Sequence, residues 1–270
     1  MPELPEVETT RLGVIDHVKH KTVSDCVVRN PSLRWPIPDD LKDSIQGQCL
    51  LDIERRGKYL LFRFAHGTML IHLGMSGSLR VMPQHSDVAK HDHVDICFDD
   101  ICLRFNDPRR FGCVLWTSDA ISEHALIAHL GPEPLQPAFD AEYLYARTRK
   151  RRQAIKTLIM DSRIVVGVGN IYANEALFNA GVHPLKAAHK VTKQQTYVLV
   201  DEIKNVLANA IKRGGTTLRD FVGGDGKPGY FAQELNVYGR AGQACKSCSK
   251  PLTEKYIAQR STVYCTRCQH

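Results

Sequence analysis

The spacing of apolar residues predicts a helix at the start of the chain. Apolar side chains recur there at nearly helical intervals, at Leu4, Val7, Val14, Ile15 and Val18. Such spacing is typical of a helix with one buried face. Pro5 and Glu6 suit its first turn, because proline lacks only an N–H that would be unpaired there and an acidic side chain complements the positive end of the helix dipole.

Between residues 20 and 118 the pattern changes to short alternating or apolar runs. Runs such as KYLLFRFA and TMLIHL are separated by breaks that contain glycine or aspartate. This pattern is typical of antiparallel strands, and it predicts a β-sandwich after the opening helix. The proline-rich segment GPEPLQPA, residues 131–138, predicts a linker.

Beyond the linker the spacing of apolar residues is helical again. Thr192 and Gln195 fit a capping box, and Gly214–Gly215 ends a long amphipathic pattern. The apolar stripe of this predicted helix consists of Leu199, Ile203, Val206, Leu207, Ala210 and Ile211. A shorter helix over ANEALFNAG is predicted to end at Gly181.

The charge is unevenly distributed over a chain of net charge +7. Residues 1–134 carry 15 basic and 19 acidic side chains, whereas residues 135–270 carry 21 and 10. A basic half indicates a polyanionic partner, most simply nucleic acid, although a solvated basic face would give the same composition. The sequence has no apolar run of about 18 residues and its acidic start differs from a signal peptide, so we expect a soluble intracellular protein.

The cysteines fall into two groups. Cys245-x2-Cys248-x16-Cys265-x2-Cys268 has the spacing of a four-cysteine zinc site, and four thiolates would close a tetrahedral, structural site. A tail of about 30 residues buries little apolar surface, so zinc would supply its folding free energy. The other five cysteines stand singly in apolar stretches and are expected to be reduced core residues. They are Cys26, Cys49, Cys97, Cys102 and Cys113.

The extreme N-terminus, MPELPEVETT, contains two prolines and three glutamates. A small second residue usually allows removal of the initiator methionine, which would leave Pro2 with a free secondary amine. A terminal amine has a pKa near 8, against about 10.4 for lysine, so more of it is unprotonated at neutral pH. From these residues alone, a catalytic Pro2 and ordinary terminal processing both stay open. Glu8 is expected to be a solvated helix residue.

Several motifs, in this order, resemble those of bacterial formamidopyrimidine-DNA glycosylases, the 8-oxoguanine repair enzymes. They are MPELPEVE at the start, HLGMSGSL at 72–79, DPRRFG at 107–112, VVGVGNIYANEALF at 165–178, TTLRDF with DGKPGYF, and the four-cysteine tail. The resemblance covers essentially the whole chain, and its motifs are too long to arise by chance.

The resemblance implies an α+β multidomain fold: an N-terminal helix plus antiparallel β-sandwich, a helical domain with a helix–two-turns–helix element, and a zinc-ribbon finger. The expected boundaries are residues 1–131 for the catalytic sandwich, 132–138 for the linker, 139–234 for the helical domain and 235–270 for the finger. We expect one structural zinc ion, no organic cofactor, and a monomer in the bacterial cytoplasm, associated with the nucleoid through DNA binding.

The resemblance also implies a bifunctional DNA glycosylase and abasic-site lyase that acts on oxidised purines in duplex DNA. An exposed Pro2 would attack C1′ of the flipped nucleotide, displace 8-oxoguanine or a formamidopyrimidine, and form an iminium. Glu3 would move protons at the sugar. Lys58 would assist β-elimination, and Arg260, near the turn of a predicted hairpin EKYIAQRSTVY, would clamp the phosphate that leaves in δ-elimination. Glu6 would support the helix start and the hydrogen bonds of the site.

By the same resemblance, three residues would fill the space of the extruded base. Met75 would enter the vacated stack, Phe111 would wedge beside it, and Arg109 would face the orphaned cytosine. Phosphate contacts are implied for His91, Arg152, Lys156 and Asn170. The stretch VGVGNIY is expected to open a helix whose backbone N–H groups face phosphate.

Residues 217–229 match the family's mobile base-covering loop, in which Arg219 stands where lysine or arginine is expected. His91 and His93 could suggest a metal pair, but the sequence offers no third ligand and we do not predict a site there.

Two other functions stay open at this stage. The related endonuclease VIII branch shares the proline, the helical element and the finger but prefers oxidised pyrimidines; Leu4 and DPRRFG favour the purine branch. A non-enzymatic zinc-ribbon protein, such as a damage sensor or regulator, would bind DNA without cutting it. The presence of Pro2, Glu3 and Lys58 argues against that second alternative.

Overall fold

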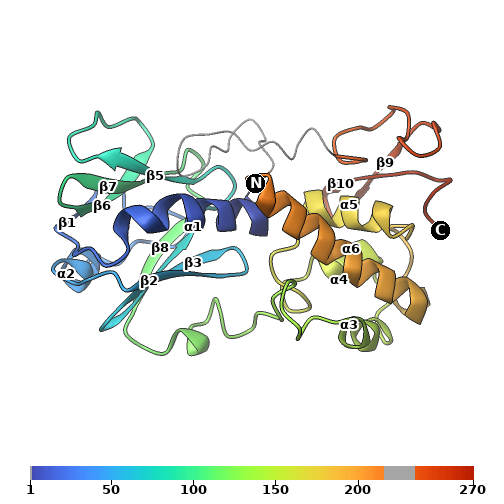
Figure 1. Ribbon diagram of the computed structural model, residues 1–270, viewed down its shortest axis with the longest axis horizontal. Coiled ribbons are helices and arrows are strands. Elements are labelled where there is room, and N and C mark those ends of the chain that lie inside the picture. The colour runs from blue at the N-terminus through green and yellow to red at the C-terminus, as the bar shows by residue number, and fades with distance from the viewer. Residues whose placement is uncertain (1, 216–234) are drawn as a thin grey trace. The chain divides into compact units, whose positions relative to one another are not determined.

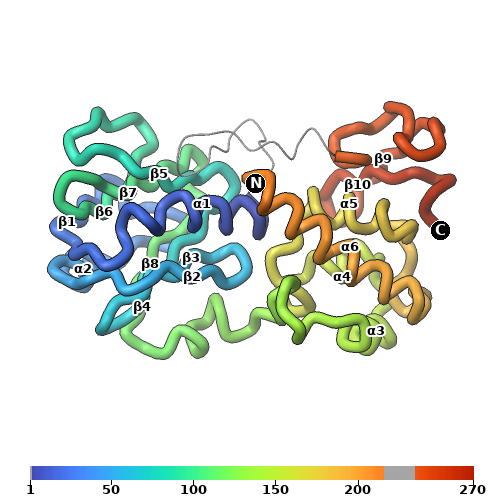
Figure 2. The backbone as a smooth tube through the Cα atoms, in the orientation of Figure 1, coloured from blue at the N-terminus to red at the C-terminus, as the bar shows by residue number. Residues whose placement is uncertain are grey.

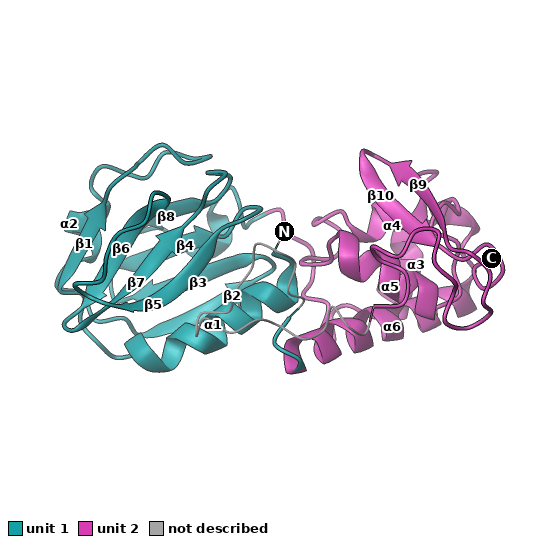
Figure 3. Cartoon of the chain, turned by 90° about the horizontal axis from the view of Figure 1, so that it is seen from above, with its two compact units in different colours: residues 1–128, 213–232 teal, residues 129–212, 233–270 magenta. Residues whose placement is uncertain are grey.

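The computed structural model describes residues 2–215 and 235–270 of the chain. The chain divides into two compact units, which we call unit 1 (residues 1–128 and 213–232) and unit 2 (residues 129–212 and 233–270) (Figure 3). Figure 1 labels the helices and strands, and Figure 2 traces the backbone through them. The division after Ala128 lies close to the predicted linker, and the predicted finger belongs to unit 2 together with the helical residues. The finer domain boundaries stay predictions.

Unit 1 begins with helix α1, Leu4–Val18, as the apolar spacing predicted. Mostly short strands follow, also as predicted. In chain order the further elements are β1 (Asp25–Val28), α2 (Leu41–Ile45), β2 (Asp52–Arg56), β3 (Tyr59–Phe64), β4 (Gly67–His72), β5 (Ser78–Pro83), β6 (Asp92–Phe98), β7 (Ile101–Asn106), β8 (Cys113–Thr117) and η1 (Ile121–Glu123).

The strands of unit 1 form two antiparallel four-stranded sheets, ordered β1-β6-β7-β5 and β2-β3-β4-β8. Buried residues from both sheets and from α1 pack into one hydrophobic cluster, so the sheets face each other as the predicted sandwich. Helix α1 contacts β2 and β3 of one sheet and β5 of the other (Figure 3). Because β2 and β5 are edge strands, α1 closes one side of the sandwich and holds its own N-terminus on a packed core.

A buried arginine fixes the segment between β5 and β6. Arg104 is 1% exposed and donates two hydrogen bonds of 2.8 Å to the carboxylate of Asp95. It also donates to the carbonyl oxygens of Asp87 (2.7 Å) and Ser86 (3.3 Å). Burial alone would raise the pKa of Asp95, but Arg104 and Arg29 lower it. The paired charges can therefore stay in the core and anchor the segment that leads to His91.

Cys97 and Cys102 form a disulfide, so the prediction of reduced core residues is wrong for this pair. They lie opposite each other in the antiparallel register of β6 and β7, next to the turn that joins these strands. The register, which the sequence spacing does not reveal, brings the two sulfur atoms together. Cys26 and Cys113 are buried and reduced as predicted, and burial raises the pKa of these thiols to about 12 and about 11. Cys49 is reduced and half-buried.

Unit 2 combines helices with a two-stranded hairpin. Its elements are α3 (Ala141–Thr148), α4 (Ile155–Ile159), α5 (Asn170–Asn179), η2 (Ala188–Lys190), α6 (Lys193–Lys212), β9 (Thr253–Ile257) and β10 (Arg260–Tyr264). Helix α6 is the predicted long helix, and Thr192 and Gln195 form its capping box with two hydrogen bonds of 3.2 Å. Helix α5 packs on α4, α6 and β10. In the described part of the chain, none of the helices is long and apolar enough to cross a bilayer.

Candidate functional site

Pro2 and Glu3 stand at the first turn of α1. Glu3 and Glu6 form a reciprocal capping box, in which a Glu6 carboxylate oxygen accepts the Glu3 N–H at 2.9 Å. The two glutamates are only 1% and 2% exposed. The family-derived expectation of an exposed Pro2 differs from the structure, in which Pro2 is buried in the full chain that begins with Met1. The capping box fixes the peptide that carries Pro2 on the rigid start of a packed helix.

Glu8 ties α1 to the sheet, so the expectation of a solvated residue is wrong. Its carboxylate accepts from Arg11 at 2.7 Å and from Arg55 of β2 at 2.8 Å. Burial would raise the pKa of Glu8, but the two guanidinium groups lower it. Glu6 supports the helix start through its capping box, as predicted, and its support of the site's hydrogen bonding stays a prediction.

Lys58 lies in the two-residue turn between β2 and β3, where Gly57 has a φ of +59°. The register of β3 and β4 sets Tyr59 opposite His72, and the two rings are 4.9 Å apart. Burial first, and then the positive charges of Lys58 and Arg34, lower the pKa of His72 to about 4. Lys58 and a neutral His72 therefore share one end of the sheet.

Sequence reasoning missed His72. Its Nδ1 accepts the N–H of Gly74 at 3.0 Å, so in the neutral ring the proton is assigned to Nε2, which can donate. The signal that could have found His72 is its position as the first residue of the motif HLGMSGSL, directly before the loop that carries Met75.

The structure brings together Met75 and Arg109, two of the three predicted void-filling residues. Met75 lies in the loop between β4 and β5, whereas Arg109 and Phe111 lie in the loop between β7 and β8. A guanidinium nitrogen of Arg109 is 3.7 Å from the Met75 sulfur. Met75 is 36% and Phe111 48% exposed. Large exposed apolar side chains next to a cation suit insertion between bases, because apolar side chains can act as wedges that separate neighbouring bases.

His91, a predicted phosphate contact, is half-buried at the end of the segment that Arg104 anchors. Its ring lies edge-on to that of His93, with the centroids 6.3 Å apart. His93 is buried and its Nε2 donates to the carbonyl oxygen of Asp107 at 2.8 Å.

In unit 2, two predicted residues donate to one carbonyl group, next to a third predicted residue in the chain. Lys156 of α4 donates to the Ser261 carbonyl at 2.9 Å and to the Thr262 hydroxyl at 2.7 Å. Asn170, the first residue of α5, donates to the same carbonyl at 3.0 Å. Arg260 directly precedes Ser261. Lys156 is only 1% exposed, so its observed contacts position the hairpin, and a phosphate contact by Lys156 stays a prediction.

Arg260 is exposed at the start of β10, as predicted for a residue near the hairpin turn. The turn residues Ala258 and Gln259 have φ values of +47° and +61°, a region that residues with a Cβ seldom adopt. Strain of this kind persists where the surrounding structure enforces it, often at functional sites. A pocket of about 330 Å³ lies between this turn and α4, lined by Gln153, Lys156, Asp161, Arg163, Ile257 and Arg260 among others. Arg152 is exposed in the segment before α4.

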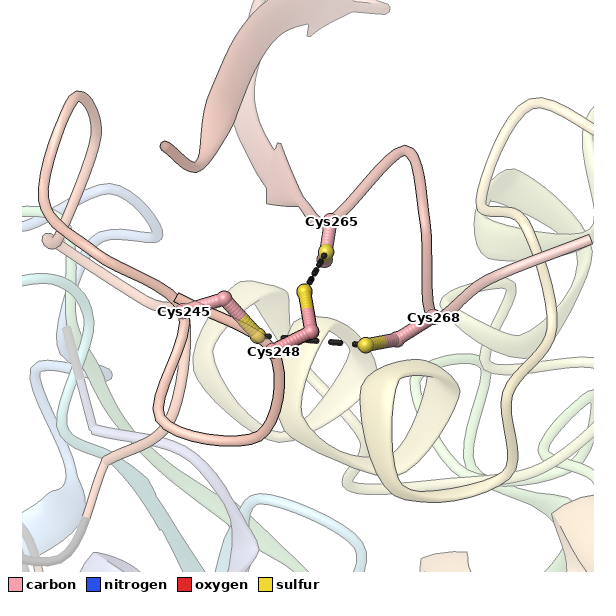
Figure 4. Close-up of side chains that lie close together, drawn as sticks. All are labelled: Cys245, Cys248, Cys265 and Cys268. Atoms are coloured by element: carbon pink, nitrogen blue, oxygen red, sulfur yellow. Dashed lines mark hydrogen bonds between the residues drawn. The ribbon is translucent and has the colours of Figure 1, made fainter. Parts of the chain in front are cut away.

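The four C-terminal cysteines converge at the base of the hairpin (Figure 4). Cys245 and Cys248 come from the loop before β9, and Cys265 and Cys268 from the turn after β10. All four sulfur atoms lie within 4.8 Å of one another, with the Cys248 and Cys265 sulfurs 3.4 Å apart. Sulfur atoms bound to zinc at about 2.3 Å in a tetrahedron are about 3.8 Å apart, so the cluster has the dimensions and the donors of a zinc site.

The thiol ionisation also fits a cation. Burial would raise the pKa of Cys265, but the N–H groups of Arg267 and Cys268 and the adjacent thiols lower it to about 7. Burial and the same adjacent thiols raise the pKa of Cys268 to about 12. Thiolates this close repel one another without a positive ion between them. Gln269 adds support, since its side chain accepts the Cys265 N–H at 2.9 Å and donates to the Val182 carbonyl at 3.0 Å.

Comparison with known proteins identifies the family. Residues 1–114 match the family model "Formamidopyrimidine-DNA glycosylase N-terminal domain", and residues 130–222 match "Formamidopyrimidine-DNA glycosylase H2TH domain". The chain is 64% identical over its whole length to the formamidopyrimidine-DNA glycosylase of Saccharophagus degradans, all of which it covers. The chain belongs to the formamidopyrimidine-DNA glycosylase family. It is a DNA-repair glycosylase, as its motifs predicted.

Solved structures of the formamidopyrimidine-DNA glycosylase family have the same fold. The MutM (FPG) protein from Thermus thermophilus aligns with a TM-score of 0.89 at 35% identity, covering 99% of this chain and 98% of that protein. A complex between a Lactococcus lactis FPG mutant and Fapy-dG containing DNA aligns with a TM-score of 0.93 at 32% identity, covering 99% of both chains. These likenesses confirm the predicted fold class, with its opening helix, antiparallel sheets, helix–two-turns–helix element and finger.

Residues 242–270 match the model "Zinc finger found in FPG and IleRS", and this segment contains all four clustered cysteines. The predicted structural zinc site is confirmed: Cys245, Cys248, Cys265 and Cys268 form the site for one zinc ion. Such a closed sulfur site supplies folding free energy to the finger and leaves no coordination position for substrate.

Some predicted residues of this glycosylase stand apart from the clusters described above. Within the part of the chain that the structure describes, no hydrogen bond or ion pair joins His91 or Arg152 to another predicted site residue. Arg219 and the predicted base-covering loop, residues 217–229, lie outside the described residues.

Proposed function

We propose that this glycosylase is bifunctional, and that it excises oxidised purines from duplex DNA and then cleaves the abasic strand. The observation that carries the proposal is the capping box that fixes Pro2 and Glu3 at the start of α1. Family membership supports the glycosylase step. The solved complex of a relative with Fapy-dG containing DNA supports an oxidised purine as the substrate.

The first step needs a nitrogen nucleophile and a proton donor. After removal of Met1, the Pro2 nitrogen has a free lone pair and can attack C1′ of the damaged nucleotide. The bond from C1′ to the base breaks, the base leaves with that electron pair, and the base takes up the proton that the Pro2 nitrogen loses after its attack. Protonation of the ring oxygen, for which Glu3 is the proposed donor, opens the sugar and leaves a cationic iminium on Pro2. A rigid helix start suits this step, since productive geometry depends on fractions of an ångström.

The second step uses the iminium as an electron sink. The iminium makes the C2′ proton acidic, and loss of this proton expels the 3′ phosphate in β-elimination. Lys58, in a sheet turn of unit 1, is proposed to assist that proton transfer. Loss of the 5′ phosphate completes δ-elimination, and the exposed Arg260 is proposed to clamp this leaving phosphate. A guanidinium remains protonated, so its role is electrostatic.

The void-filling role of Met75, Arg109 and Phe111 completes the proposal. Extruding a base costs several kilocalories per mole of stacking and pairing, which inserted side chains partly restore. The exposure of Met75 and Phe111 and the contact of Met75 with Arg109 support this role. His91, Arg152 and Asn170 are retained as proposed phosphate contacts, whereas the buried Lys156 is proposed to act on DNA binding by positioning the hairpin.

The proposed partner is double-stranded DNA that contains oxidised purines, bound by a monomer in the bacterial cytoplasm. The excess of basic residues in the second half of the chain supports a polyanionic partner. Bacterial relatives and the absence of a membrane-spanning helix among the described residues agree with this location. Sedimentation of the full chain with one duplex should give a one-to-one complex.

Borohydride trapping tests the mechanism. Borohydride reduces an iminium to a stable amine, so incubation with an 8-oxoguanine·cytosine duplex should yield a crosslinked protein whose sugar maps to Pro2. A variant that retains Met1 should lose trapping but keep DNA binding, because its Pro2 nitrogen is an amide.

Two controls refine the trapping experiment. Glu3→Gln should lose base excision yet cleave a pre-formed abasic site, where no bond to a base has to break. A duplex with thymine glycol should react more slowly than one with 8-oxoguanine. Trapping that maps to Lys58, or faster reaction with thymine glycol, would contradict the proposed nucleophile or substrate.

A further inference from the structure

Asp107 links the two loops that carry the proposed void-filling residues. Its Oδ1 accepts from the Ser76 hydroxyl at 3.0 Å and from the Arg109 N–H at 3.3 Å. Its Oδ2 accepts the Gly112 N–H at 2.8 Å. We propose that Asp107 is a positioning residue that holds these loops in one arrangement, so that Met75, Arg109 and Phe111 enter DNA together. This inference rests on the proposed function.

The partners of Asp107 are the neighbours of the void-filling residues. Ser76 directly follows Met75, the second donor is the backbone of Arg109 itself, and Gly112 directly follows Phe111. Asp107 and Ser76 are 31 positions apart in the sequence, so this hydrogen bond is a tertiary contact between two loops. One carboxylate thereby holds two backbone N–H groups of the loop that carries Arg109 and Phe111, and the side chain next to Met75 in the other loop.

Burial makes these hydrogen bonds matter. Asp107 is 0% exposed, so water cannot replace a lost protein donor without a rearrangement of the loops. Hydrogen bonds to a carboxylate are shorter and stronger than those between neutral groups, and a buried carboxylate that lacks donors is costly. The loops therefore keep the arrangement in which all three donors face Asp107.

The two loops also touch backbone to backbone. A Cβ added at Gly74 would lie 2.5 Å from the Gly112 nitrogen, and one added at Gly112 would lie 2.5 Å from the His72 carbonyl oxygen. Neither distance is compatible with a side chain. Because the backbones of the two loops are in direct contact, a displacement of one loop also displaces the other.

The main chain of Asp107 adds a third segment to this arrangement. Its N–H donates to the His91 carbonyl at 3.1 Å, and its carbonyl accepts from His93 Nε2 at 2.8 Å. His91 is a proposed phosphate contact. Asp107 therefore also connects a proposed phosphate-binding segment to the two loops whose side chains are proposed to enter the DNA stack.

The test compares a lesion that requires all three inserted side chains and the breaking of a base pair with one that has no pair to break and no orphaned base for Arg109 to face. One duplex pairs 8-oxoguanine with cytosine; the other sets it opposite a tetrahydrofuran abasic analogue, so that no base pair breaks and no orphaned base remains. Asp107→Asn replaces one acceptor oxygen by an NH₂ donor, which cannot accept a hydrogen bond. Its single-turnover excision should fall about 10- to 100-fold on the paired lesion, as expected for a displacement near 1 Å, and within about threefold on the unpaired one.

Two further variants keep the test decisive. Ser76→Ala removes one donor and should give a smaller loss of about 3- to 10-fold, again confined to the paired lesion. Leu103→Ala lies in the buried core of β7 and is the control for general destabilisation. It should lower the Tm but leave the ratio of the two rates unchanged well below that Tm.

An observation that does not need turnover separates this inference from the proposed function. With 2-aminopurine next to the lesion, insertion of the loops unstacks the probe and raises its fluorescence. Asp107→Asn and Ser76→Ala should each give a smaller and slower rise than the wild type. A wild type that binds and gives the rise but does not excise 8-oxoguanine contradicts the proposed function alone. Wild-type rates and fluorescence in both variants, or equal losses on both duplexes, overturn the role of Asp107.

Discussion

The two units hold their functional residues by different physical means. In unit 1, α1 packs on a sandwich core to which both sheets contribute, and Pro2 and Glu3 stand at the start of that helix. In unit 2, the hairpin that carries Arg260 has a much smaller apolar cluster, two members of which are zinc ligands. Its buried members are Phe178, Val237, Cys245, Leu252, Val263 and Cys265. Removing apolar contacts should therefore damage the first arrangement, and removing the metal the second.

Polar contacts supply what the small cluster of unit 2 lacks. The Glu175 carboxylate of α5 accepts the N–H groups of Asn236 (2.7 Å), Val237 (2.9 Å) and Tyr238 (2.8 Å). The Asn174 side chain accepts the Val263 N–H at 3.0 Å. These bonds direct the chain into the finger and hold β10 on α5. A buried carboxylate that accepts several backbone N–H groups fixes the conformation of those residues. An apolar core mainly supplies folding free energy.

The largest expected effect comes from loss of zinc. Cys265→Ser removes one of four ligands, and structural zinc contributes of the order of 10 kcal/mol to the folding of a finger. We expect less than one zinc per chain by elemental analysis and a loss of DNA affinity of about 100-fold or more. Amide exchange in α1 and the sheets of unit 1 should stay slow. Loss of amide-exchange protection in both units would show that the core of unit 1 also depends on zinc, which would contradict the comparison.

The converse change removes core packing from unit 1. Phe62 of β3 is fully buried in the sandwich cluster. Phe62→Ala should lower the free energy of unfolding by about 3–5 kcal/mol, through lost burial and the cavity that remains. Chemical denaturation measures this, and elemental analysis of the same sample should still find one zinc ion per chain. Loss of zinc in this variant would show that the zinc site of unit 2 depends on the core of unit 1, which would contradict the comparison.

A smaller effect is expected from pH at His72. Because the folded pKa is about 4, below the ordinary value of 6.5, the unfolded chain takes up the proton first as the pH falls. The contribution of His72 to stability is therefore constant above pH 6.5 and is lost progressively towards pH 4. Between pH 7 and pH 5 this loss should be about 1–2 kcal/mol.

His72→Asn is the matched variant for that measurement. Its amide oxygen can still accept the Gly74 N–H, as His72 Nδ1 does, but the side chain does not titrate. Urea denaturation at pH 7 and pH 5 should therefore show a smaller decrease in stability for the variant. An equal decrease in both proteins would assign the pH dependence to other groups.

The smallest expected effect distinguishes buried from exposed basic residues within unit 2. Lys156→Met removes hydrogen bonds to Ser261 and Thr262, so we expect DNA binding to weaken about tenfold through misplacement of the hairpin, with no change in salt dependence. The exposed Arg152 is the matched control. Arg152→Ala should make the slope of log K against log salt shallower by about one unit. A similar change of slope in Lys156→Met would instead support a direct phosphate contact by Lys156.

Much of the fold could be predicted because its signals are local. The period of apolar residues located α1 and α6, and the capping box at Thr192 and Gln195 needs only residues three positions apart. The alternating runs indicated antiparallel strands. Helix α2 escaped prediction, since its five residues are too few to show a period.

The zinc ligands and the motif residues were found for a related reason. Two cysteines separated by two residues can form half of a metal site within one turn, so the sequence shows their spacing directly. The roles of the other site residues follow from the long motifs in which they stand. Glu8 and Cys97 were assigned by residue type, and Lys156 by the resemblance, in each case without knowledge of the tertiary partner. The partner of each lies on another strand or helix, 47 positions away for Arg55 and 105 for Ser261.

By itself, the sequence determined the chemistry available to this protein: an N-terminal proline beside glutamates, four thiols at metal spacing, and basic and apolar residues suited to DNA. The tertiary structure decided which of these groups act together. It buried the Lys156 ammonium against Ser261 and gathered three donors around Asp107. The physical reason is that a side chain's charge and shape are local properties, whereas its burial and its hydrogen-bond partners depend on segments that meet only when the chain has folded.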